Sequence, residues 1–90
     1  MSKSKPGETR RSRKARTVPY QKTYDALVGL LIEAREESGM TQRQVSESLG
    51  MAHSFLSKCE TGERSIDVID LIQLAKLYGK PIQYFFPDQT

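Results

Sequence analysis

The sequence predicts an all-α protein of five helices, and three observations support this fold class. Apolar side chains recur at intervals of three and four residues through most of the chain, which is the spacing of one helical face. Residues that can cap a helix precede these periodic segments, and glycines follow them. No stretch alternates apolar and polar residues as a half-buried strand does. A chain of 90 residues suits one small domain.

The first helix is expected from Gln21 or Lys22 to Ser38, where Gly39 ends it. Its core stripe at helical spacing is Leu27, Leu30, Leu31 and Ala34. A second apolar stripe lies off the first and consists of Tyr24, Val28 and Ile32. Two explanations for this second stripe stay open, namely packing on Tyr20 or Val18, and contact with another subunit.

Two short helices with a tight turn between them are predicted from Met40 to Gly62. Thr41 can cap the first of them, with Gln44 three residues on as in a capping box, and Gly50 ends it. The second lies around residues 53–61 and turns Leu56 and Cys59 inward. Its outer face is polar and carries His53, Ser54, Ser57 and Lys58. This arrangement is a helix-turn-helix.

Two further helices complete the predicted domain. Asp67 caps a helix from Val68 to Tyr78, which Gly79 ends. Its expected inner face repeats at three and four residues and comprises Val68, Leu71, Ile72, Ala75 and Tyr78, with Leu74 flanking. Pro81 fits the first position of a last short helix over residues 81–86, because its missing N–H costs nothing there.

The charge is divided unevenly along the chain. Residues 1–23 hold eight basic side chains and one acidic side chain, a net +7, whereas residues 24–90 are −4, which together make the net charge of +3. Residues 1–22 lack apolar periodicity and are expected to form a disordered basic arm. The domain then covers residues 23–87, and residues 88–90 form a tail. The arm's basic side chains include Arg10, Arg11, Arg13, Lys14 and Arg16.

Several classes of protein are excluded by composition. The longest apolar run is too short to span a membrane, and the N-terminus lacks the apolar region of a secretory signal, so a cytoplasmic protein is expected. One cysteine and one histidine provide neither a disulfide nor a zinc site. Neither a phosphate-binding loop nor a nucleophile beside a base is present, so we expect no enzyme, no cofactor and no second domain that senses a small molecule.

The stretch 40–62 resembles the Cro/cI-type phage-repressor helix-turn-helix family, also called the XRE family. The matching residues are Thr41 and Gln42, Gly50, Ser57 and Lys58, and Glu60 to Gly62, and the resemblance extends from about Leu27 to Phe86. It implies a compact lambda-repressor-like domain and a sequence-specific, repressor-like transcriptional regulator. Ala52 departs from the family pattern, which usually has a capping residue there, at a cost of about 1 kcal/mol. The start of the second motif helix is therefore left open.

The resemblance also implies roles for individual residues. The expected base contacts are His53, Ser54, Ser57 and Lys58, and Lys58 suits guanine O6 and N7. The resemblance assigns Gln42 a phosphate contact, and Arg43, Thr61 and Arg64 are further candidates for such contacts. Arg35 is expected to pair with Glu60. Phe55 either covers the gap between the motif helices or touches a thymine methyl. The basic arm is expected to lie along phosphates or in the minor groove.

A homodimer on double-stranded DNA is predicted, because one recognition helix reads too few base pairs to select a genomic site. Tyr84 and Phe86 on the last helix are the preferred contact, since related repressors dimerise there. Tyr24, Val28 and Ile32 are the other candidate surface. The acidic domain and the extra apolar stripe keep one alternative open, a protein-interaction module such as an antitoxin-like partner or bridging adaptor.

Overall fold

The structure is a computed structural model that describes residues 17–87, with side chains from residue 20 onward. The described chain contains four α-helices and one 3₁₀ helix and no strand. These are α2 (Thr17–Ser38), α3 (Gln42–Ser48), α4 (Phe55–Thr61), α5 (Val68–Tyr78) and η1 (Ile82–Phe85). The all-α class is confirmed, although the fifth helix is a single 3₁₀ turn. Residues 1–16 and 88–90 lie outside the described residues, so the predictions for the basic arm and the tail are not tested.

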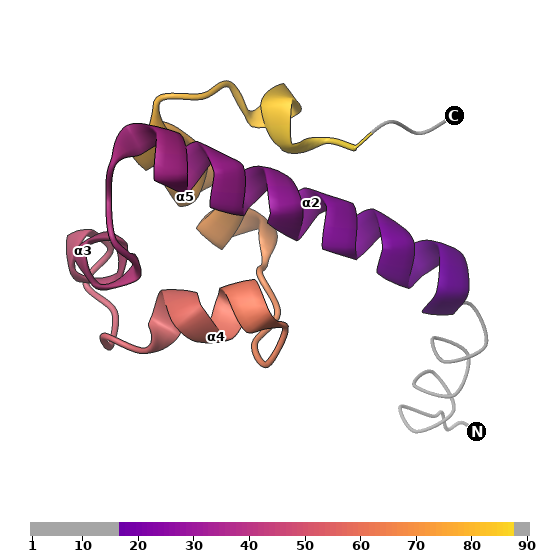
Figure 1. Cartoon of the computed structure of the whole chain (residues 1–90), viewed down its shortest axis with the longest axis horizontal. Coiled ribbons are helices and arrows are strands. Elements are labelled where there is room, and N and C mark those ends of the chain that lie inside the picture. Colours follow the sequence, from indigo (N-terminus) through magenta and orange to yellow (C-terminus); the bar gives the residue numbers. More distant parts are fainter. Residues whose placement is uncertain (1–16, 88–90) are drawn as a thin grey trace, which may run out of the picture.

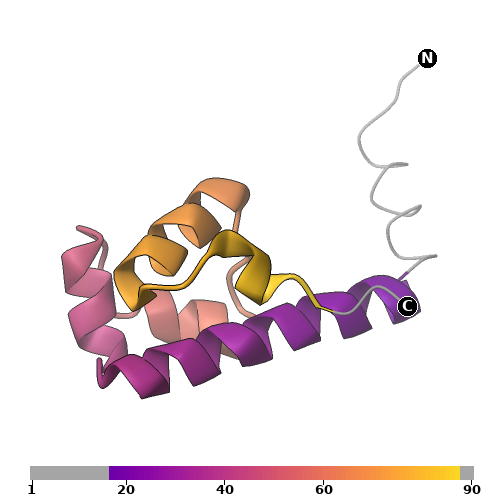
Figure 2. The ribbon, with the colours of Figure 1, turned by 90° about the horizontal axis from the view of Figure 1, so that it is seen from above.

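The longest element, α2, forms one side of the molecule, and the other helices pack against its C-terminal part (Figures 1 and 2). Its N-terminal turns extend past the other helices in both views. The helix begins at Thr17, not at Gln21 or Lys22, and so includes residues 17–22 that were expected to belong to the arm. Pro19 does not prevent this, because a proline in the first helical turn gives up an N–H that has no intrahelical partner.

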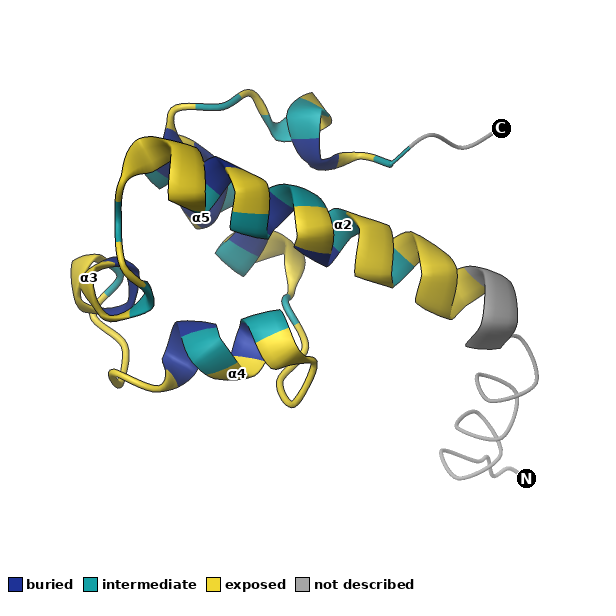
Figure 3. Ribbon diagram, in the orientation of Figure 1, coloured by how far each residue is buried: buried dark blue, intermediate teal, exposed yellow. Residues whose placement is uncertain are grey.

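The core lies between α2 and the other four helices, whose buried residues face inward (Figure 3). Its buried members are Leu31, Ala34, Val45, Phe55, Leu56, Cys59, Leu71, Leu74, Ala75, Tyr78 and Phe85. One expectation for α5 was wrong, and one core residue of η1 was not foreseen. Val68, which was expected on the inner face, is 64% exposed, and its neighbour Ile69 is 61% exposed. Phe85, which was not singled out, is fully buried and is the largest such side chain.

The ends of the short helices follow local capping chemistry. Thr41 and Gln44 form the predicted capping box at α3, and Asp67 forms another with Asp70 at α5. Gly50 has φ 72° between α3 and α4, and Gly62 has φ 89° after α4. These left-handed conformations strain any side-chain-bearing residue, so the two glycines set where the chain turns on either side of α4.

The second apolar stripe of α2 packs within the chain. The Tyr24 hydroxyl accepts a hydrogen bond from the Ile66 backbone N–H at 3.1 Å, and Val28 is 9% exposed. Tyr20 stacks on Tyr24 with ring centroids 6.5 Å apart. Together with the end of α4, the stripe lines a groove of about 260 Å³. The stripe therefore covers the α4 end and the connection to α5, rather than packing only on residues at the start of its own helix.

Candidate nucleic-acid interface

A hydrogen bond from one motif helix to the other holds α4 in place. Ser46 on α3 is fully buried, and its hydroxyl accepts the Leu56 backbone N–H at 3.1 Å. The side chain of Ser54, at the N-cap of α4, makes no capping bond, and Ala52 has no side-chain acceptor. Ser46 therefore caps α4 from the neighbouring helix and satisfies one of its unpaired N–H groups. Sequence reasoning missed this role, although a serine beside Val45 on the inner face was a signal.

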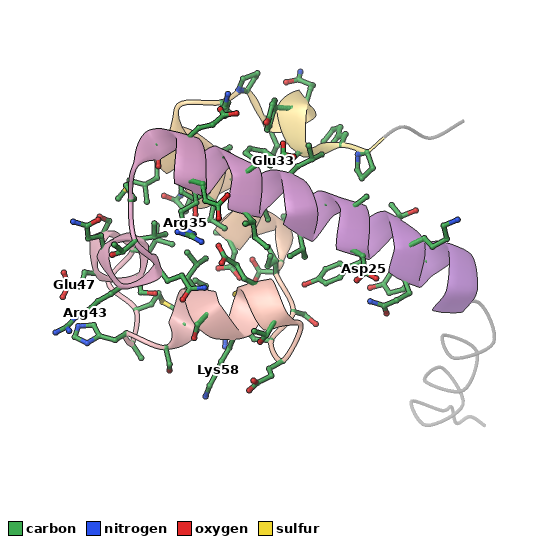
Figure 4. All side chains as sticks on the ribbon, viewed as in Figure 1. Asp25, Glu33, Arg35, Arg43, Glu47 and Lys58 are labelled. Atoms are coloured by element: carbon green, nitrogen blue, oxygen red, sulfur yellow. The ribbon has the colours of Figure 1, made fainter. Side chains whose placement is uncertain are left out.

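The second motif helix begins at Phe55, two residues later than the expected start near residue 53. His53 and Ser54 consequently lie in the turn before α4. The Ser46 hydroxyl accepts the N–H of Leu56, the second residue of this helix. Lys58 is exposed and projects away from the rest of the molecule (Figure 4). Ser57 is half-buried and donates its hydroxyl to the Ser54 carbonyl at 3.1 Å.

Phe55 belongs to the buried core of the domain. It is 4% exposed, which leaves its ring out of reach of a thymine methyl. The Arg64 guanidinium lies over this ring, 4.8 Å from its centroid, in the geometry of a cation–π contact. The Arg64 backbone N–H also donates to the Lys58 carbonyl at 3.1 Å. These two contacts position Arg64 at the end of α4. Thr61, also exposed, donates its hydroxyl to the same carbonyl at 3.2 Å.

A hydrogen-bond network ties α4 to α2 and α3. Arg35 donates from Nε and Nη2 to the two carboxylate oxygens of Glu60, at 2.8 and 3.2 Å, and from Nη1 to the Met40 carbonyl at 3.0 Å. The Gln42 amide donates to Glu60 at 2.8 Å. The Arg35 and Glu60 side chains are only 14% and 7% exposed. The hydrogen bond to Glu60 raises the pKa of Arg35 above its ordinary value, although burial opposes this.

A second charged cluster lies at the other end of α4. Glu47 Oε2 is 3.0 Å from His53 Nε2 and 3.7 Å from Arg43 Nε. All three side chains are more than half exposed, and Arg43 and Glu47 lie side by side on α3 (Figure 4). Glu47 was not among the residues predicted for the interface. Its position four residues after Arg43 predicts the helical pair, but nothing in that spacing predicts the contact with His53.

The structure thus brings the expected contact residues to α4 and to the segments beside it. Ser54, Lys58, Thr61 and Arg64 are exposed, whereas Gln42 is half-buried. The candidate dimer residues separate into two groups. Phe86 is 55% exposed and Tyr84 is half-buried, whereas Val28 is 9% exposed and Tyr24 and Ile32 are half-buried. Phe86 also lines an apolar groove of about 190 Å³ together with Tyr20, Thr23, Tyr24, Leu27, Leu71, Phe85 and Pro87.

Two other features of residues 17–87 bear on the class of protein. None of the described helices is long and apolar enough to cross a membrane. The same residues contain no group of three His, Cys, Asp or Glu side chains that could hold a metal ion.

This fold and this site define a helix-turn-helix protein. A family model described as helix-turn-helix matches residues 31–85, more than half of the chain, and the chain therefore belongs to this family, in its XRE branch. Among solved structures, an XRE-family like protein from Pseudomonas syringae pv. tomato is similar with a TM-score of 0.72 and 34% identity. That match covers 81% of this chain and 88% of the other.

Curated relatives are similar over the same region. The HTH-type transcriptional regulator PuuR of Escherichia coli is 34% identical over 58 residues, which are 64% of this chain and 31% of PuuR. The uncharacterized HTH-type transcriptional regulator y4dJ of Sinorhizobium fredii is 40% identical over 45 residues, which are 50% of this chain and 58% of y4dJ. The chain thus spans about a third of PuuR and more than half of y4dJ.

Proposed function

We propose that this chain is a sequence-specific DNA-binding transcriptional regulator of the repressor type and not an enzyme. One observation carries the proposal: α4 is fixed to the rest of the domain from both ends while its polar face stays exposed. Ser46 holds its start, and the Arg35–Glu60 pair holds its end. A helix held in this way loses little conformational entropy on entering the major groove. Family membership and relatives that are themselves HTH-type transcriptional regulators support the same function.

In this proposal the residues have two kinds of role. His53, Ser54, Ser57 and Lys58 contact base edges, with Lys58 suited to guanine O6 and N7. The phosphate contacts are Gln42, Arg43, Thr61 and Arg64. Gln42 donates one amide N–H to Glu60, and its second amide N–H is the proposed donor to a phosphate. The basic arm adds sequence-independent affinity, because the rest of the chain has a net negative charge.

The proposed assembly is a homodimer on a palindromic site, acting in the cytoplasm. One α4 helix contacts only a few base pairs, and two-fold pairing doubles the sequence that is read. The exposed Phe86 ring and the adjoining apolar groove favour the surface around η1 as the contact. Val28, in the middle of the other candidate surface, is only 9% exposed, which disfavours that surface.

The test is selection of bound fragments from genomic DNA, followed by mobility shifts on the selected site and on random DNA. Lys58→Ala is expected to weaken binding to the selected site by about 1–3 kcal/mol and to weaken binding to random DNA by less. Lys76→Ala is a matched control, because Lys76 is an exposed lysine on α5. Failure to enrich any site would contradict the proposal and favour the protein-interaction module.

A further inference from the structure

The Glu47 carboxylate contacts two residues of the proposed interface and has no role in it so far. It lies 3.0 Å from the His53 imidazole, which precedes α4, and 3.7 Å from the Arg43 guanidinium. We propose that Glu47 is a positioning residue that determines which bases His53 accepts. This inference rests on the proposed DNA-binding function, and it concerns a side chain that is not itself expected to contact a base.

The short distance decides which ring nitrogen of His53 carries the proton. A carboxylate oxygen offers only lone pairs, so a second lone pair on a nitrogen 3.0 Å away would be repelled. The contact therefore favours the tautomer that has its hydrogen on Nε2. In the neutral ring this leaves Nδ1 as an acceptor, since the two nitrogens of a neutral imidazole are one donor and one acceptor. Glu47 thus selects one tautomer of His53, as a carboxylate partner does for a metal-bound histidine.

The tautomer has a consequence in the major groove. An acceptor at Nδ1 can pair with the exocyclic amino group of adenine or cytosine, and it is repelled by guanine O6 and N7 and by thymine O4. A histidine free to exchange tautomers would accept any of the four bases. Glu47 therefore lets His53 discriminate between bases, partly because guanine and thymine are repelled.

The same carboxylate has an opposite effect on general affinity. Its negative charge lies beside Arg43, a proposed phosphate contact, and opposes the approach of a polyanion. Removing that charge should strengthen binding to every sequence while weakening the preference at one base pair. If Glu47 had only a structural role, its removal would not raise the affinity for all sequences while lowering the preference at one base pair.

The first experiment uses the free protein. His53 is the single histidine of the chain, so nitrogen NMR of the full-length protein shows one imidazole. The neutral ring of the wild type should carry its proton predominantly on Nε2. Glu47→Gln should show a mixture with part of the population protonated on Nδ1, because an amide can both donate and accept. Glu33→Gln, an equal charge change on the exposed side of α2 away from Lys58 (Figure 4), should leave the wild-type tautomer.

The second experiment uses the selected site with each base pair replaced in turn. At one position of each half-site, the wild type should disfavour guanine and thymine about fivefold, which corresponds to roughly 1 kcal/mol. Glu47→Gln should reduce this preference below about twofold and tighten binding to random DNA, whereas Glu33→Gln should keep the preference. The inference would be overturned if Glu47→Gln kept the wild-type tautomer of His53. It would also be overturned if Glu47→Gln still bound the selected site with the same base preference as the wild type. A wild type without any preferred site would instead refute the proposed function.

Discussion

Removal of the Glu60 carboxylate is expected to destabilise the domain severely. Glu60 accepts three hydrogen bonds, two from Arg35 and one from Gln42. Glu60→Ala leaves Arg35 without a counter-ion, although the Arg35 side chain is only 14% exposed. Breaking a buried ion pair from one side costs about 3–5 kcal/mol. Arg35 keeps its bond to the Met40 carbonyl, so we take the lower figure, about 3 kcal/mol.

This loss is large beside the total stability. A folded domain of this size has about 4–10 kcal/mol of unfolding free energy, at roughly 0.05–0.15 kcal/mol per residue. A loss of about 3 kcal/mol corresponds to a fall in melting temperature of roughly 12–24 °C. Thermal and urea unfolding followed by far-ultraviolet circular dichroism measures both quantities. Glu63→Ala is the matched control, because Glu63 is exposed and carries the same charge.

The double variant Arg35→Met/Glu60→Leu separates the unpaired charge from the lost packing. It removes both charges, so it should be more stable than Glu60→Ala. In a mutant cycle with the single variants Arg35→Met and Glu60→Leu, the coupling energy should be about 1–3 kcal/mol. Equal melting temperatures for Glu60→Ala and Glu63→Ala would refute the reasoning. A strictly additive double variant would show that the two side chains do not act as a pair.

Three further predictions concern other groups. Ser46→Ala should lower the unfolding free energy by about 1–3 kcal/mol, because the Leu56 N–H loses its buried acceptor, and Ser48→Ala on the exposed face is the control in the same urea titrations. The Tyr78 hydroxyl has no hydrogen-bond partner among the described residues, and burial raises its pKa, so the folded state holds this proton more tightly than the unfolded state. That stability is present below the unfolded pKa of about 10 and is lost as the pH rises above it. In urea melts, Tyr78→Phe should therefore have about the same unfolding free energy as the wild type at pH 7. Above a pH of about 10 the variant should lose less unfolding free energy than the wild type. Deletion of residues 1–16, which leaves α2 whole, should flatten the slope of log K against log salt by about 3 while site preference remains, and an unchanged slope would remove the arm from the mechanism.

Local chemistry made most of the fold predictable. Helix positions follow from the spacing of apolar residues and from caps such as Thr41 and Asp67, which act within three residues of themselves. The family resemblance added Arg35 and Glu60, a pair that no local pattern relates. Where local signals were weak, the boundaries moved: α2 begins earlier than expected at Thr17, and α4 begins later at Phe55.

Tertiary structure alone decided the contacts between elements. Ser46 caps α4 across ten residues of chain, and Glu47 reaches His53 across the turn between the motif helices. The sequence by itself determined that two short helices with a polar outer face would form, because capping and periodicity are properties of neighbours. It did not determine which side chains meet across the turn, because those distances depend on how the helices pack against α2 and against each other. Ser46, which caps the start of α4, and Glu47, which contacts His53, therefore emerged only from the packed domain.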